Sequence, residues 1–255
     1  FERFDVSSDE VGSLSLSGHW PTDPSAEPGA LQASLKNLWA GDWRGAVPLA
    51  PPRITGELKL AGRSDDWNAT LAGDWQYGEP RGPLNLQLSG TPAAIVIAPS
   101  SLGLAQSLLE FNGQIGLEPS TVGLDIKATA LDPALIDPAW PGKLDATLRI
   151  DAKFGETNSW ELAITQLSGN LRAAPLSVQG MLSGVDASPQ AGDLNVTWGN
   201  GKADIVVGAG QEFVADLNDL DLALLGPLQG TVSGRLATKL DGEPIETTTA
   251  LLQIE

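Results

Sequence analysis

Few residues in this chain have side chains suited to catalysis. Its single histidine, His19, lies beside Trp20 in a stretch rich in glycine and proline. A lone histidine without further ligands or acid–base partners rarely forms a metal site or a catalytic centre. The chain has no cysteine, which excludes thiol nucleophiles, disulfides and metal sites that need sulfur. We therefore expect His19 to be a surface or packing residue, and we expect no cofactor and no bound metal.

The acidic residues near position 219 are the strongest candidate for a cation site. Asp216, Asn218, Asp219 and Asp221 offer the oxygen ligands that Ca²⁺ prefers. They lack the ligand spacing and the central glycine of an EF-hand loop. We interpret them as a solvated turn.

Two pairs of carboxylates are compatible with glycoside hydrolysis, which uses two carboxyl groups flanking the bond that is cleaved. They are Asp65 with Asp66, and Asp132 with Asp137. Nothing in the sequence places either pair at a cleft, and aspartate is also a common turn residue. The G-x-S-x-G motif of serine hydrolases is absent from the sequence. We expect the protein not to be an enzyme.

Tryptophans provide a further possibility, because their rings can stack on sugars. Examples are Trp39, Trp43, Trp67 and Trp75. The commoner use of such amphipathic rings is to cap the ends of an apolar face. A carbohydrate-binding or adhesin-like role nevertheless stays open at this point.

Composition limits the classes of partner. The 255 residues are 42% hydrophobic, and 15 basic residues against 32 acidic ones give a formal net charge of −17. Nucleic acid would be repelled over most of such a surface, and no basic block offers a docking patch for an anionic membrane. No apolar run is long enough for a transmembrane helix. Any contact with lipid must therefore be apolar, and we expect no nucleic-acid partner.

Alternation with a period of two is the main structural signal. In residues 142–153 the even positions after Gly142 are aliphatic and the odd positions are polar or charged. Such a pattern predicts a strand with one dry and one wet face. The pattern recurs in roughly fifteen short segments bounded by turn residues, which predicts an all-β, antiparallel fold. Only residues 101–110 and 132–140 are compatible with a turn or two of helix.

An internal repeat accompanies the alternation. Three similar stretches, 35–38, 128–131 and 217–220, are each followed by proline and then by an alternating strand. The unit is about ninety residues long, which is typical of growth by stacking along one axis. We predict one continuous segment over residues 1–255, with approximate repeats at 31–127, 128–214 and 215–255, the last being partial.

The apolar faces of these strands must be hidden from water. A sandwich with Greek-key connections suits a repeat along one axis less well than an extended sheet curled lengthwise into a trough. We expect such an elongated antiparallel sheet, with an apolar groove lined by aliphatic side chains. The predicted lining residues are Leu58, Leu60, Leu84, Leu86, Leu88, Leu124, Ile126, Leu144, Leu148, Ile150, Leu162, Ile164, Leu194 and Val196. The alternative is that these side chains fill the core of a sandwich.

Residues 166–180, with the sequence QLSGNLRAAPLSVQG, resemble the "L-x-G-x-L-R-x-x-P-L-x-x-x-G" strand pair of the TamB family. This family comprises translocation and assembly module subunits of Gram-negative bacteria. Further similarity lies in residues 192–200, GDLNVTWGN, and in the leucine, proline and glycine pattern of residues 217–234. The resemblance extends from about residue 128 to 250, and before that it rests on the repeat.

The resemblance implies a fold and a function. Proteins similar to TamB are anchored in the inner membrane, cross the periplasm, and fold as a "β-taco" whose apolar groove carries phospholipid acyl chains toward the outer membrane. They partner a BamA-like outer-membrane protein (TamA), which we expect to contact parts of the protein outside this chain. The chain begins at Phe1 and ends in a strand-like run, so we expect an internal segment of a longer periplasmic protein.

Two functional hypotheses follow. The first is a segment of a periplasm-spanning bridge that shelters phospholipid acyl chains between the two membranes and supports outer-membrane biogenesis. The second is a non-enzymatic interaction module. Such a module would be either a holdase that pairs outer-membrane protein strands along exposed sheet edges or an extracellular binding repeat.

Overall fold

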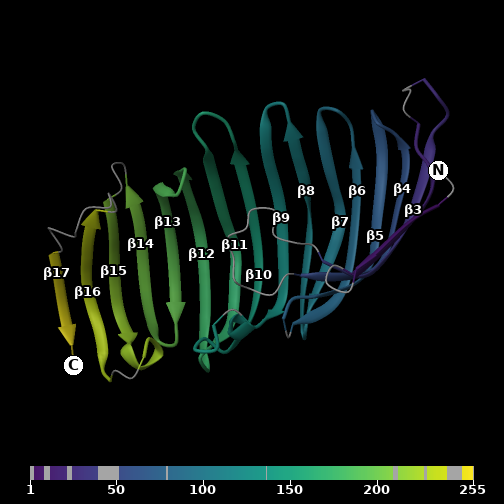
Figure 1. The fold of residues 1–255 in the computed structure, drawn as a ribbon. Helices are drawn as coiled ribbons and strands as arrows, with labels where there is room; N and C mark the ends of the chain where they lie inside the picture. The colour runs from purple at the N-terminus through teal and green to yellow at the C-terminus, as the bar shows by residue number, and fades with distance from the viewer. Residues whose placement is uncertain are drawn as a thin grey trace. The chain divides into compact units, whose positions relative to one another are not determined.

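The fold is all-β and antiparallel, which confirms the predicted fold class at this level (Figure 1). The computed structural model describes residues 3–8, 12–21, 25–39, 52–78, 80–135, 137–208, 212–226, 229–239 and 249–254. The chain divides into two compact units, an N-terminal unit of residues 1–118 and a C-terminal unit of residues 119–255.

The N-terminal unit is a meander in which each strand pairs antiparallel with the next one along the chain. Its strands are β1 (Arg3–Ser8), β2 (Gly12–His19), β3 (Gly29–Trp39), β4 (Arg53–Arg63), β5 (Asp66–Gln76), β6 (Arg81–Gly90), β7 (Ala94–Leu104) and β8 (Ser107–Leu117).

The C-terminal unit continues the same pattern of consecutive antiparallel pairs. Its strands are β9 (Ser120–Leu131), β10 (Gly142–Lys153), β11 (Ser159–Leu171), β12 (Ala174–Val185), β13 (Ser188–Trp198), β14 (Gly201–Gly208), β15 (Glu212–Asp221), β16 (Thr231–Lys239) and β17 (Thr249–Ile254). In the described part of this unit, short 3-10 helices lie in two connections between strands: η1 (Pro133–Leu135) and η2 (Leu222–Leu224).

The sequence is compatible with a turn or two of helix in residues 101–110 and 132–140, and the structure differs between these two segments. Residues 132–140 do contain the single 3-10 turn η1. The expectation for residues 101–110 was wrong, because these residues form the hairpin of β7 and β8. The chain reverses at Ala105, whose φ of 56° allows the tight turn.

Each unit presents one polar and one half-buried apolar face. Exposed and half-buried positions alternate along β6, as the period of two requires. Among the described residues no side chain is less than 2% exposed. The buried apolar residues are mostly small: Ala33, Leu35, Ala69, Ala128, Leu144, Ala146, Ala174, Trp198, Ala203, Val207, Ala215 and Val232. Apolar burial is therefore spread thinly over one face of each unit, without a deep core.

A recurring bulge marks the three similar sequence stretches. In each, the third of four residues has a left-handed backbone, at Asn37, Ala130 and Asp219, with φ of 53°, 54° and 51°. Its N–H donates to a side-chain oxygen on the facing strand. These acceptors are Thr55 for Asn37 (2.9 Å), Asp145 for Ala130 (2.8 Å) and Ser233 for Asp219 (2.8 Å).

At each of these positions the ladder register shifts, as expected when an extra residue enters one strand. The three bulges lie about ninety residues apart. The division of the chain into repeats of this length stays a prediction, as does the lengthwise curl of the sheet.

Candidate functional site

Apolar side chains of the C-terminal unit form rows that run from strand to strand. Residues directly opposed in an antiparallel pair project to the same face. The register opposes apolar or glycine residues on every strand from β9 to β16. One row contains Ile126, Leu148, Ile164, Gly180, Leu194, Ile205, Ala215 and Leu236. Seven strand spacings make this row roughly 34 Å long.

Two further rows flank the first on the same face, each two to three residues away along the strands. One contains Leu124, Ile150, Leu162, Leu182, Gly192, Val207 and Phe213. The other contains Ala128, Ala146, Leu167, Val178, Val196, Ala203, Leu217 and Gly234. The C-terminal unit thus carries a continuous aliphatic surface, which we call the C-terminal apolar face.

The N-terminal unit carries an equivalent surface, the N-terminal apolar face. One of its rows contains Leu31, Leu60, Ala69, Leu88 and Ile97. A second contains Ala33, Leu58, Leu71 and Leu86, and a third contains Leu35, Gly56, Gly73, Leu84 and Leu102.

All fourteen predicted lining residues lie on these two faces. Leu144 is buried at 6% exposure beside the C-terminal rows, opposite Leu131 and Gly169. The other thirteen are half-buried. The structure therefore places the predicted residues side by side on two apolar faces. Their role in lining a lipid groove stays a prediction.

The predicted lining residues of the N-terminal apolar face all lie on β4 and β6, so sequence reasoning missed the parts of this face that β3, β5 and β7 supply. Strand β5 supplies Ala69, Leu71 and Gly73 between the leucines of β4 and β6. Small residues weaken its hydrophobic alternation, so its apolar side is less visible in the sequence. The signal that could have found it is the period-two run of Trp67, Ala69, Leu71, Gly73 and Trp75.

The opposite, polar face is crossed by exposed ion pairs. Arg149 Nε donates to Asp151 Oδ2 at 2.7 Å, and its Nη1 lies 3.2 Å from Asp125 Oδ1 on the neighbouring strand. The hydrogen bonds and charge of Asp151, followed by the charge of Asp125, raise the pKa of Arg149. Asp216 and Arg235 are paired in the same way across β15 and β16 at 3.8 Å. Exposed pairs of this kind add little stability. Their exposure shows that this face is the one in contact with water.

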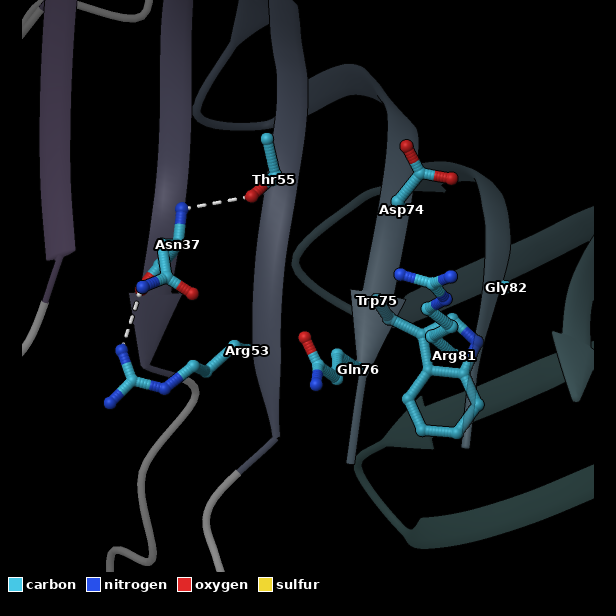
Figure 2. A pocket seen from close by; sticks show the side chains of 8 residues that line it. All are labelled: Asn37, Arg53, Thr55, Asp74, Trp75, Gln76, Arg81 and Gly82. Carbon is cyan, nitrogen blue, oxygen red and sulfur yellow. Dashed lines mark hydrogen bonds between the residues drawn. The ribbon is translucent and has the colours of Figure 1, made fainter. Parts of the chain in front are cut away.

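A cavity of about 550 Å³ lies where β4 and β5 meet β3 and β6 at one end of the N-terminal unit (Figure 2). It is lined by Asn37, Arg53, Thr55, Asp74, Trp75, Gln76, Arg81 and Gly82. The register opposes Gln76 to both Arg53 and Arg81, so these three project to the polar face. Trp75 and Gly82 are opposed to each other and belong to the apolar face. The cavity therefore lies at a rim where the two faces meet.

The aspartates considered as catalytic or calcium-binding groups have structural partners. Asp132 Oδ1 accepts from the backbone N–H groups of Ala134 and Gly142, both at 3.0 Å. Asp137 and Asp221 accept in the same way from residues two positions onward, at 2.9 Å. The carboxylates thus shape turns and helix starts. The expected turn around Asp219 is a bulge within β15.

His19 is exposed at the end of β2. Within the described ranges no group of three or more histidine, cysteine or acidic side chains could hold a metal ion. Trp43 and the side chain of Trp39 lie outside the described residues. Trp67 and Trp75 each contact the backbone or a glycine of the neighbouring strands.

Comparison with known proteins identifies a family for this chain. The family model described as "TamB, N-terminal domain" matches residues 54–246. Neither the curated proteins nor the solved structures give a match. No helix in the described part of the chain is long and apolar enough to cross a membrane. The family match covers well over half of the 255 residues, and the resemblance seen in residues 166–180 is thereby confirmed: the chain belongs to the TamB family.

Proposed function

We propose that this chain is a segment of a periplasmic bridge that shelters phospholipid acyl chains on its apolar faces as they move between the inner and outer membranes. The strands would curl lengthwise so that these faces line a groove, which would serve outer-membrane biogenesis. Membership of the TamB family supports this role and a location in the Gram-negative envelope. A BamA-like outer-membrane partner (TamA) would bind parts of the protein outside this chain.

One observation carries the proposal. In-register rows of aliphatic side chains cross eight strands of the C-terminal unit, and the predicted lining residues other than Leu144 are only half-buried. Residues that fill a sandwich core would be buried on both sides, and no described side chain is less than 2% exposed. A continuous, partly uncovered aliphatic surface suits a flexible hydrocarbon chain.

Transfer energies explain why such a surface is useful. Each methylene exposed to water costs about 0.8 kcal/mol, so a sixteen-carbon chain crossing the periplasm unaided would cost about 12 kcal/mol. An aliphatic lining removes most of that cost. Successive rows of similar residues hold the chain about equally well, which favours movement over tight binding at one place.

The test places a charge on the apolar face and, as a matched control, on the polar face one residue away. Leu148→Arg should reduce co-purified phospholipid more than tenfold, since a desolvated guanidinium beside an acyl chain costs several kcal/mol. Thr147→Arg points to the exposed face and should leave bound phospholipid unchanged. Native mass spectrometry measures the lipid, and circular dichroism checks the fold.

Absence of phospholipid from the unmodified chain, or equal loss in both variants, would contradict the proposal. The interaction-module hypothesis would then be the better account. It predicts binding of unfolded outer-membrane strands that is indifferent to Leu148→Arg.

A further inference from the structure

The two edges of the C-terminal apolar face differ in the connections that they carry. Because successive strands run antiparallel, the connections after β9, β11, β13 and β15 lie at one edge of the unit, and those after β10, β12 and β14 lie at the other (Figure 1). The first edge, which we call the capped edge, carries the long connections, residues 132–141 and 222–230. The second, which we call the open edge, carries shorter ones, the longest being residues 154–158.

Both long connections begin in the same way. The carboxylates of Asp132 and Asp221 accept the backbone N–H of the second residue onward, at 3.0 Å and 2.9 Å. Aspartate commonly starts turns by this hydrogen bond, and each connection continues into a 3-10 turn, η1 or η2. Both connections therefore turn directly at the end of a strand, where their side chains can reach the last row of the apolar face.

The last row at the capped edge is buried in part by the first long connection. This row contains Leu131, Leu144, Gly169, Leu176, Trp198 and Gly201. Leu144 is 6% exposed and Trp198 is 7% exposed. The Trp198 indole Nε1–H donates to the backbone oxygen of Leu171 at 3.1 Å, which holds the ring in place. The Trp140 ring lies 6.0 Å from the Trp198 ring, so Trp140 packs against this row.

Arg172 ties the two long connections together. Its guanidinium lies 5.3 Å from the centre of the Trp140 ring, and its Nη1 donates to the backbone oxygen of Leu224 at 2.7 Å. The Leu224 Cδ1 atom lies 3.3 Å from the position that a Cβ of Gly199 would occupy, so it packs on the turn after β13. Arg172 is half-buried, and both kinds of contact strengthen when water is partly excluded. We call Trp140, Arg172, Trp198 and Leu224 the edge cap.

The last row at the open edge is less covered. It contains Val122, Ala152, Trp160, Gly184 and Pro189. All of these are half-buried except Gly184, which the Trp160 ring covers. Phe154, which follows β10 at this edge, is 50% exposed. The Trp160 indole Nε1–H donates to the backbone oxygen of Asp186 at 2.9 Å. Indole rings suit such a boundary between apolar and wet surroundings.

We propose that the edge cap closes one edge of the C-terminal apolar face, so that a bound phospholipid lies with its headgroup at the open edge, beside Trp160, and its acyl chains on the uncovered rows. This inference rests on the proposed function, because it assigns the orientation of the same lipid. A headgroup at the capped edge would have to displace Trp140 and Arg172 from their contacts. At the open edge the headgroup keeps its water, which polar groups lose only at a cost.

The first experiment determines the orientation in the unmodified chain. The whole chain is loaded from phosphatidylcholine vesicles that carry a nitroxide either near the headgroup end or near the methyl end of one acyl chain. After removal of the vesicles, the NMR line widths of the Trp160 and Trp198 indole N–H signals and of the apolar-face methyl groups are measured. The headgroup-end nitroxide should broaden Trp160 several-fold more than Trp198. The methyl-end nitroxide should broaden the methyl groups of the inner rows more than Trp160.

The outcomes separate this inference from the proposed function. Equal broadening of the two indoles by the headgroup-end nitroxide, or stronger broadening of Trp198, would overturn the orientation while leaving acyl-chain binding intact. If neither nitroxide broadened any methyl group of the apolar face, the proposed function would be refuted, and this inference with it.

The second experiment tests the edge cap as the cause of the orientation. Arg172→Met keeps an apolar stem but loses the hydrogen bond to Leu224 and the cation on Trp140. The headgroup-end nitroxide should then broaden Trp198 several-fold more than in the unmodified chain. Arg149→Met, which removes an arginine paired with aspartates on the polar face, is the matched control and should change neither indole.

Trp140→Ala provides a second variant, because it removes the ring that packs on Trp198 and leaves Arg172 in the chain. It should have the same effect on Trp198 as Arg172→Met, and circular dichroism checks that each variant is folded. Protection of Trp198 that persists in a folded variant of either kind would show that the edge cap does not close this edge, and would overturn the proposal.

Discussion

At the scale of single residues, the left-handed backbone at Asn37, Ala130 and Asp219 shows how local chemistry fixes a bulge. Asn and Asp adopt this conformation more readily than most residues, whereas alanine does so at a cost of about 1 kcal/mol or more. At all three places a Thr, Asp or Ser side chain on the facing strand accepts the N–H of that residue. The bulge at Ala130 should depend most on its acceptor.

We therefore predict that Asp145→Ala destabilises the chain by about 1 kcal/mol, because the N–H of Ala130 loses its partner at 2.8 Å. Chemical denaturation measures the loss. Thr147→Ala, on the same face of the same strand, is the control and should cost less than half as much. Equal effects would mean that the Asp145 contact contributes nothing specific to the bulge.

A second residue-scale prediction concerns pH. The Ser15 hydroxyl donates to Asp5, and Arg3 Nε lies 2.8 Å from its other oxygen, which together lower the pKa of Asp5. A carboxylate whose pKa is lower in the folded chain stabilises it above the unfolded value of about 3.9. That contribution is lost as the pH falls through the folded value.

Pairing of β1 with β2 should accordingly weaken below about pH 4. Amide exchange of residues 3–8 measures it. Asp5→Asn should show faster exchange at neutral pH and a smaller change on acidification than the unmodified chain. An identical acid response in the two proteins would show that Asp5 is not the group responsible.

At the scale of elements, paired tryptophan and glycine residues set how closely neighbouring strands and rings pack. Gly90 is opposite Trp67 on the N-terminal face, and Gly184 is opposite Trp160 in the C-terminal unit. A Cβ atom at these glycines would lie 2.2 Å and 2.4 Å from the indole rings. The rings therefore cover the glycines, at positions about ninety residues apart in the chain.

We predict that Gly184→Ala destabilises the chain by about 1–3 kcal/mol, because the ring or the strand must move to make room. Gly155→Ala is the control, since nothing lies within 4 Å of the position of its Cβ. Thermal unfolding, together with Trp160 fluorescence, measures both. A neutral Gly184→Ala would show that the ring moves aside freely and does not hold the strands in register.

A cluster at the connections of the C-terminal unit illustrates how distant elements are tied together. The Arg172 guanidinium lies 5.3 Å from the centre of the Trp140 ring and donates to the backbone oxygen of Leu224 at 2.7 Å. The Trp140 and Trp198 rings are 6.0 Å apart. Arg172, which sequence similarity marks as part of a family motif, thus joins the turn before β12 to η2.

At the scale of the whole molecule, the proposed function implies one lipid path that uses both apolar faces. Charged substitutions on the two faces should then obstruct the same path in series. Leu86→Asp on the N-terminal apolar face and Leu148→Arg on the C-terminal apolar face should each reduce phospholipid transfer between donor and acceptor vesicles more than tenfold. The double variant should be only slightly slower than the stronger single one, because resistances in series add and do not multiply. Gln87→Asp and Thr147→Arg, on exposed positions of the same strands, are the controls.

Independent lipid sites on the two units would give a different result. Each single variant would then retain the transfer supported by the other unit, and only the double variant would lose it. That outcome would contradict a single lipid path and would favour separate binding surfaces.

The sequence by itself determined that the fold is all-β and antiparallel, which side of several strands is apolar, and the family. Period-two alternation is a local property, because successive side chains of a strand must point to opposite faces. Leu144, Leu148 and Ile150 could therefore be assigned to one face from residues 142–153 alone. The order of motifs in residues 166–180 was sufficient to indicate the TamB family, which the match over residues 54–246 confirmed.

Only the tertiary structure decided which strands supply each row and where charge meets the apolar face. Row membership depends on register, and register depends on bulges such as the one at Ala130 that shift the pairing by a residue. The rim cavity brings together Asn37, Arg53, Asp74 and Arg81 from four strands, and no local pattern links them. Long-range pairing alone creates that juxtaposition, because residues far apart in the chain become neighbours only once the ladders have formed.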